Sequence, residues 1–134
     1  MTLSERIRTA KRVYIIGNGG SYANAIHICN DLIASGVRAH TLDPATLTAT
    51  ANDYGYEHVF SQWLVTMAEP GDMLIALSGS GKSPNILRAI EFAYGLGMDV
   101  YKVFGAPKLD MQSAEEEQIK IGHNVMRELK WSKN

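Results

Sequence analysis

The sequence predicts an α/β fold, a three-layer αβα sandwich around a parallel sheet of four strands. Short apolar runs such as Val13–Ile16 alternate along the chain with longer amphipathic segments. The run Val13–Ile16 is continuously apolar, which is typical of a strand buried on both faces of a parallel sheet. Two Gly/Ser-rich stretches, residues 17–21 and 78–83, each follow or end such a run. Because parallel α/β sheets bind ligands at the carboxyl ends of their strands, these stretches are candidate binding loops.

The order of the elements follows from periodicity. Four strands are predicted, at residues 13–16, 38–42, 72–78 and 98–104. Amphipathic spacing predicts helices at residues 2–10, 21–36, 43–55, 56–68, 83–97 and 113–131. Residues 105–112 are expected to form a loop, and Asn52–Gly55 a corner between two helices. In the helix at 83–97 the expected inward stripe is Ile86, Leu87, Ile90, Ala93 and Tyr94.

Capping residues set the expected helix ends. Ser, Thr, Asp and Asn are preferred at the first position because their side chains accept a free backbone N–H, and Gly commonly ends a helix. The expected caps are Thr2 or Ser4 for the first helix, Ser21 and Gly36 for the two ends of the second, and Ser113 with Glu116 as a capping box for the last.

Composition limits the function classes. A chain of 134 residues, 46% hydrophobic and 20% charged, is expected to form one domain, residues 1–134. The net charge of −1 gives no reason to expect nucleic acid or a membrane surface as a partner. Neither a membrane-spanning run nor the apolar middle of a signal peptide is recognised. The single cysteine, Cys29, is expected to be a core residue and fits a reducing cytoplasm. Trp63 and Trp131, both on amphipathic stretches, are expected to pack.

The stretch "IALSGSGKSPN", residues 75–85, permits three interpretations. Gly81-Lys82-Ser83 matches the end of a nucleotide-binding P-loop whose first position would be Ala76. That interpretation is disfavoured because no strand ends in the aspartate that would hold magnesium and only one strand follows, so no nucleotide is expected. A second interpretation is a cradle for one phosphoryl group, with serine hydroxyls and the free N–H groups of the following helix as donors. The third is an ordinary turn of small residues.

His27 and Asp31 also suggest chemistry, because residues four apart share a helix face and this face begins close to the first glycine loop. A carboxylate and a histidine are suitable groups for moving protons next to a carbonyl, and His and carboxylate ligands also suit Zn²⁺. The structural alternative is a partly buried histidine paired with Asp31, with Asp31 itself a solvated charge.

Three motifs, "GNGGS", "ANDYGY" and "LSGSGKSPN", resemble those of the sugar isomerase (SIS) domain family, and their order and spacing are most similar to phosphoheptose isomerases. The resemblance runs from about Val13 to Met98 and resumes in the last helix. It implies a shortened SIS fold, a phosphorylated sugar as partner, and a homo-oligomer, either a tetramer or a dimer. It also implies that the chain interconverts sedoheptulose 7-phosphate and D-glycero-D-manno-heptose 7-phosphate through acid–base enediol chemistry.

The resemblance assigns roles residue by residue. It implies that Asp31 is the catalytic base and His123 the acid, with zinc held by His27, Asp31, Glu115 and His123. The implied substrate-binding residues are Asn18, Gly19, Gly20 and Ser21 for the sugar, Asn52 and Asp53 in the middle motif, Ser78, Gly79, Ser80 and Ser83 for the phosphate, and Glu115.

The chain departs from the family pattern at several points. Asp31 stands where the family has Glu, and Glu115 where it has Gln. If Glu115 and His123 share one helix they lie ~12 Å apart along it, so one rigid helix cannot bring both to one ion. Residues 105–112 are too few for the family's fifth strand, and only 12 residues precede the first strand. These departures keep an alternative open, a non-catalytic sugar-phosphate-binding or protein-interaction module on the same fold.

Overall fold

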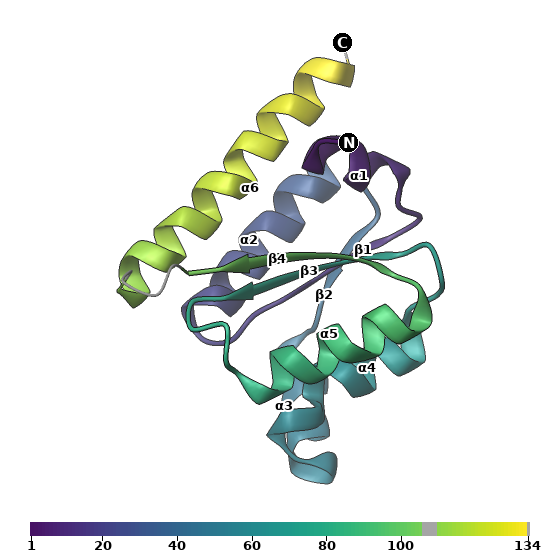
Figure 1. Cartoon of the computed structure of the whole chain (residues 1–134), viewed down its shortest axis with the longest axis vertical. Helices are drawn as coiled ribbons and strands as arrows, with labels where there is room; N and C mark the ends of the chain where they lie inside the picture. Colours follow the sequence, from purple (N-terminus) through teal and green to yellow (C-terminus); the bar gives the residue numbers. More distant parts are fainter. Residues whose placement is uncertain (106–109, 134) are drawn as a thin grey trace.

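The sheet has four strands, as expected. The computed structural model describes residues 1–105 and 110–133, and for residues 131–133 it describes the helical backbone alone. All neighbouring strands are parallel (Figure 1). Their order across the sheet is β2 (Ala39–Thr41), β1 (Val13–Ile16), β3 (Met73–Ser78) and β4 (Asp99–Phe104). The carboxyl ends of β1 and β3 therefore meet at one edge of the sheet.

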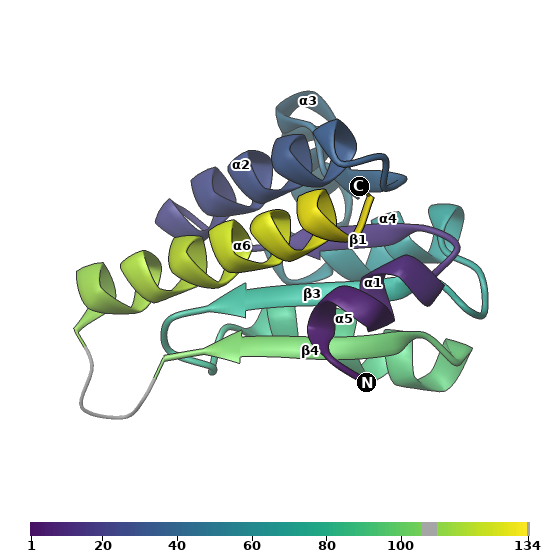
Figure 2. The same cartoon turned by 90° about the horizontal axis from the view of Figure 1, so that it is seen from above.

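Helices cover both faces of the sheet and form the expected three layers (Figure 1 and Figure 2). One outer layer holds α1 (Leu3–Thr9), α2 (Gly20–Ala34) and α6 (Met111–Lys133). The other holds α3 (Pro44–Tyr54), α4 (Val59–Met67) and α5 (Pro84–Leu96), with a 3-10 turn, η1 (Tyr56–His58), between α3 and α4.

The two hydrophobic cores follow from strand alternation. Successive side chains of a strand point to opposite faces, so Val13 and Ile15 pack under α2 and α6, whereas Tyr14 and Ile16 pack under α4 and α5. Every residue of β1 and β3 is buried. Burying an aliphatic side chain of this size stabilises the fold by ~1.5–3 kcal/mol, so these strands form the rigid base from which the loops extend. Cys29 is buried in the first core, and burial raises the pKa of its thiol.

Polar side chains of α1 bind both the sheet and α6. Thr2 and Glu5 form a reciprocal capping box at the start of α1, so Thr2 rather than Ser4 is the cap. Arg6 binds Asp99 of β4 through two hydrogen bonds of 2.6 and 2.9 Å, and its guanidinium lies over the ring of Tyr101. The hydroxyl of Ser4 donates to Glu128 of α6.

Two predicted caps are wrong. The helix α2 begins at Gly20 with Gly19 as its cap, so Ser21 lies inside the first turn. The helix α6 begins at Met111, because the carboxylate of Asp110 accepts the N–H of Ser113 at 2.7 Å. An aspartate at this position satisfies the free N–H groups as well as the predicted serine would.

The buried face of α5 and the end of α3 also differ from expectation. In α5 the residues Leu87 and Tyr94 are exposed, since the contact face is centred on Ile86 and Ile90 and turns them outward. The helix α3 continues through Tyr54, and the corner is at Gly55 alone, whose φ of 94° favours glycine. The predicted stop at Gly36 is confirmed, because this glycine follows the C-cap Ser35 of α2 and has φ of 87°.

Some expectations lie partly outside the described residues. The loop predicted for residues 105–112 includes residues 106–109, which lie outside the described residues. The predicted packing of Trp131 concerns a side chain that also lies outside the described part of the chain. Trp63 packs edge-on against Tyr14 at a centroid distance of 5.3 Å, as its amphipathic position indicated. Among the described residues, none of the helices combines the length and apolar character needed to cross a bilayer.

The Arg6–Asp99 pair predicts a pH-dependent contribution to stability. Its hydrogen bonds hold the pKa of Asp99 below the ordinary value of 3.8. The pair therefore stabilises the fold fully at pH values above 3.8, and this stabilisation is lost as the pH falls through the lowered pKa. Because Asp99 is 44% exposed, we expect Asp99→Asn to lower the free energy of unfolding at pH 7 by no more than about 1 kcal/mol. Urea unfolding at pH 7 and pH 3 measures the difference, with the exposed Glu91→Gln as control. A difference that is equally large at both pH values would contradict this account.

Candidate active site

The two candidate loops are joined by a pair of amides at the carboxyl edge of the sheet. Asn18, after β1, donates to the side-chain oxygen of Asn85 at 2.8 Å, and Asn85, in the first turn of α5, donates back at 2.9 Å. The hydroxyl of Tyr56 also donates to the Asn18 oxygen, at 2.7 Å. Asn85 is buried, so the exchange of two hydrogen bonds fixes the loops relative to each other.

A hollow of about 210 Å³ opens beside Asn18. Its walls come from the first glycine loop, α2, α3 and η1, and include Tyr22, Leu47 and Tyr56. The hydroxyl of Tyr22 donates to the Leu42 carbonyl, and burial raises the pKa of this phenol. The hollow thus offers aromatic walls and backbone groups of Gly17 and Gly19 to a small polar ligand.

The serine-rich loop after β3 is organised by its own hydroxyls. Ser78 accepts the N–H of Gly81 at 2.9 Å, and Ser80 accepts the N–H of Lys82 at 3.1 Å. Gly81 has φ of 68°, a backbone conformation that favours glycine. Gly79 lies so close to Met111 of α6 that a side chain at this position would collide with the methionine sulfur. The loop turns tightly and leads directly into α5.

The N-terminus of α5 remains available to an anion. Ser83 is its cap, but the side chain of Ser83 makes no capping hydrogen bond, and Pro84 occupies the first helical position. Free N–H groups and the helix dipole at such a terminus favour negative charge. This is the arrangement expected of a phosphate cradle.

A second cluster joins α2 and α6. His27 Nε2 lies 3.1 Å from His123 Nε2 and 3.3 Å from a carboxylate oxygen of Asp31. One potential ligand atom from each residue lies within 4.8 Å of those of the other two. His27 is half exposed and Asp31 mostly buried. Two imidazole nitrogens and one carboxylate oxygen are a ligand set that suits Zn²⁺ and leaves a fourth position open.

Glu115 does not join this cluster among the described residues. It lies eight residues before His123 on α6, as expected, and its carboxylate lies against Gly20 at the start of α2, where a side chain on residue 20 would collide with it. The backbone oxygen of Glu115 accepts the side-chain amide of Asn24 at 2.9 Å. Glu115 is therefore placed at the first glycine loop and not with the two histidines.

The other predicted site residues have distinct surroundings. Ser21 is buried, and its hydroxyl accepts the side-chain amide of Gln118 at 2.9 Å. Asn52 and Asp53 lie exposed in the last turn of α3, where the Asn52 amide donates to Asp53 at 3.2 Å. Asn18, Gly19 and Gly20 lie at the first loop as expected.

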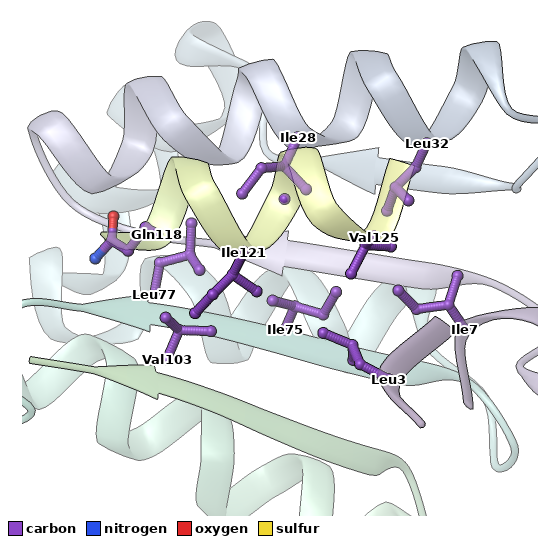
Figure 3. A pocket seen from close by; sticks show the side chains of 11 residues that line it. Leu3, Ile7, Ile28, Leu32, Ile75, Leu77, Val103, Gln118, Ile121 and Val125 are labelled. Atoms are coloured by element: carbon purple, nitrogen blue, oxygen red, sulfur yellow. The ribbon is translucent and has the colours of Figure 1, made fainter. Parts of the chain in front are cut away.

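Three residues in this region were not predicted from the sequence: Asn85, Tyr56 and Gln118. Gln118 is the most informative, because it lies on the inward stripe of α6 and is 1% exposed. It ends a small cavity of about 20 Å³ whose other lining residues are apolar (Figure 3). A lone amide on an apolar stripe was the available signal, since buried polar groups need partners.

Comparison with known proteins identifies the family. Residues 2–105 match the family described as "SIS domain". This chain belongs to the SIS domain family. The match includes both loops and α2 but ends before α6, so His123 lies outside it.

Curated SIS relatives extend the comparison. The chain is 41% identical over 108 residues to the phosphoheptose isomerase of Rhodospirillum rubrum. The aligned region covers 75% of this chain and 57% of that protein. It is 32% identical over 130 residues to the phosphoheptose isomerase of Aeromonas hydrophila, covering 90% of this chain and 67% of that protein. The chain thus spans roughly three-fifths to two-thirds of the length of these relatives.

The fold comparison includes the last helix. The solved phosphoheptose isomerase from Neisseria gonorrhoeae superposes with a TM-score of 0.88 at 26% identity, covering 96% of this chain and 80% of that one. The SIS fold of this chain therefore extends beyond the residues that the family match contains.

The Asn18–Asn85 pair predicts a stability effect specific to the loops. Asn85→Ala leaves the buried side of the Asn18 amide without its partner, so we expect the free energy of unfolding to fall by about 1–3 kcal/mol. The exposed Asn30→Ala on α2 serves as control and should change it by less than about 0.5 kcal/mol. Equal losses in both variants, measured by urea unfolding, would show that the amide pair contributes nothing special.

Proposed function

We propose that this chain is a sugar-phosphate aldose–ketose isomerase, with sedoheptulose 7-phosphate and D-glycero-D-manno-heptose 7-phosphate as its substrate pair. The observation that carries the proposal is the His27–Asp31–His123 group, which lies on the two helices that border the first glycine loop. The relatives named phosphoheptose isomerase support the choice of sugar.

The proposed phosphate position is the loop after β3. The donors for a phosphoryl group would be the hydroxyls of Ser80 and Ser83 and the N–H groups in the first turn of α5, where the Ser83 side chain makes no capping hydrogen bond. Lys82 is exposed beside them and adds a positive charge to the loop. The sugar then extends toward Asn18 and the hollow beside it, which brings its carbonyl end toward the first glycine loop.

Asp31 and His123 have the proposed acid–base roles. The Asp31 carboxylate takes the proton from the carbon beside the carbonyl, and the electron pair of that C–H bond becomes the double bond of an enediol. His123 gives a proton to the carbonyl oxygen in the same step. Asp31 then returns its proton to the former carbonyl carbon while His123 takes the proton of the neighbouring hydroxyl. Each such group typically contributes ~10²–10⁴-fold to the rate.

The same three residues would hold a zinc ion. His27, Asp31 and His123 supply two nitrogens and an oxygen at ligand spacing, and a bound Zn²⁺ supplies polarisation of the substrate carbonyl. Glu115 lies apart from them and is proposed to contact the sugar instead, at the first glycine loop. A homo-oligomer in the cytoplasm is the proposed setting.

The test of this function follows the sugar by NMR in deuterated water, with purified protein and sedoheptulose 7-phosphate, with and without added zinc. We expect new aldose signals and deuterium at the reacting carbon. Deuterium exchange without aldose would mean that the base works on this sugar but that the product is misassigned. Binding without either change would favour the alternative, a non-catalytic sugar-phosphate-binding or protein-interaction module.

The assignment of the base predicts a separation of turnover from binding. We expect Asp31→Asn to lower kcat by about 10²–10⁴-fold, because the amide cannot accept the proton, while the affinity for the sugar phosphate stays within about threefold. Asp31→Glu, which restores the longer carboxylate of the family, is the matched control and should retain turnover. Undiminished turnover in Asp31→Asn would remove Asp31 from the mechanism.

The phosphate position predicts opposite effects on binding and stability. In Ser83→Asp the new carboxylate can cap α5, so the free energy of unfolding should stay equal or rise by about 0.5 kcal/mol. The same charge repels the substrate phosphate, so affinity measured by calorimetry should fall at least about tenfold. Ser83→Ala, which adds no charge, should weaken binding less. Unchanged affinity in Ser83→Asp would place the phosphate elsewhere.

A further inference from the structure

The helices α2 and α6 lie side by side in both views of the molecule (Figure 1 and Figure 2). They bring His27 and His123, 96 positions apart in the sequence, to 3.1 Å between their Nε2 atoms. Nothing in the chain connection alone sets this distance. The contacts between the helices must fix how far α6 has slid along α2 and how it is rotated about its own axis.

Gln118 supplies directional contacts at this interface. Its side-chain oxygen accepts the Asn24 amide at 2.9 Å, and its side-chain nitrogen donates to the Ser21 hydroxyl at 2.9 Å. Asn24 donates at the same time to the backbone oxygen of Glu115 at 2.9 Å. Hydrogen bonds depend on angle and distance, whereas apolar contacts tolerate sliding. Both ends of the Gln118 amide thus fix α6 at one position on α2.

Gly122 sets the separation of the helices. A Cβ atom at this position would lie 2.7 Å from Cγ1 of Ile28, which is too close for real atoms. Glycine therefore allows α6 to approach α2 directly beside His123. Ile28 lies between α2 and α6 in the close view of this interface, with Gln118 near one end (Figure 3).

We infer that Gln118 and Gly122 are positioning residues for the His27–Asp31–His123 group. The inference rests on the proposed function in so far as that function gives the three residues a catalytic role. The contacts that hold the three residues together do not depend on any reaction. A slip of one residue along a helix is a shift of ~1.5 Å and a rotation of ~100°. Such a slip would carry His123 away from His27. One Zn²⁺, whose bonds to histidine nitrogens are ~2.0–2.1 Å long, could then no longer bind both residues.

Two measurements on the full chain test the positioning role. Cobalt(II), the probe, is titrated against a competing chelator and followed by its absorption spectrum. Without metal, the nuclear Overhauser contact between the His27 and His123 rings reports their adjacency directly. In Gln118→Met we expect cobalt affinity to fall about 10–100-fold and the contact between the rings to weaken or vanish. The control Ile90→Val removes a methylene from the core on the other face of the sheet and should change neither.

A pair of substitutions at the helix contact gives a second test. Gly122→Ala should separate the helices and reduce both signals, and Gly122→Ala combined with Ile28→Ala should restore them, because the second change removes the colliding atom. A general loss of stability would not be reversed by a second core truncation. Restored cobalt affinity and ring contact in the double variant would support the inference even where Gln118→Met folds poorly.

The outcomes separate this inference from the proposed function. Retention of the contact between the rings in Gln118→Met and in Gly122→Ala overturns the positioning role, whatever the metal does. Absence of that contact in the unmodified chain also overturns it. If the unmodified chain shows the contact but binds no cobalt, the zinc proposal fails, and the ring contact in the variants alone decides the positioning role.

Discussion

The burial of β1 and β3 on both faces is the constraint on which the rest of the structure depends. Such burial comes with parallel pairing: a tight turn cannot join two parallel neighbours, so each connection crosses over through helices, and these helices cover both faces. This requirement places the loops after β1 and β3 at one edge of the sheet. The Asn18–Asn85 amide pair then joins loops that the topology has already made neighbours.

The catalytic candidates depend on a different kind of contact. The loops are fixed by the sheet, but His123 reaches His27 only because α6 returns along α2. That return is long-range, and we attribute its accuracy to the buried amide of Gln118 and to Gly122. Under the proposed function, the loops would thus form a rigid part for the phosphate, and the packed helix pair would hold the proton-transfer groups. Changes at the helix contact can alter the second part while the first stays intact.

The sequence predicts the strands and the sheet well because the information is local. The apolar runs at residues 13–16 and 73–77 are short and are each followed by glycine and serine, which is typical of buried strands that lead into loops. The partners of Gln118 were not predictable, since nothing local indicates that its amide meets Ser21 and Asn24. The start of α6 was misplaced for a related reason, because Asp110 and Ser113 are both good capping residues and only the fold chooses between them.

For the proposed substrate, the position of Glu115 favours one of two helix N-termini as the phosphate site. Both α2 and α5 begin at the carboxyl edge of the sheet, and each offers free N–H groups and a favourable dipole to an anion. The Glu115 carboxylate already lies against Gly20 at the start of α2, so a phosphate there would meet a negative charge. The first turn of α5 is capped by no described side chain. Under the proposed function, like-charge repulsion at one terminus and its absence at the other would orient a sugar phosphate with its phosphate toward α5 and its sugar toward α2.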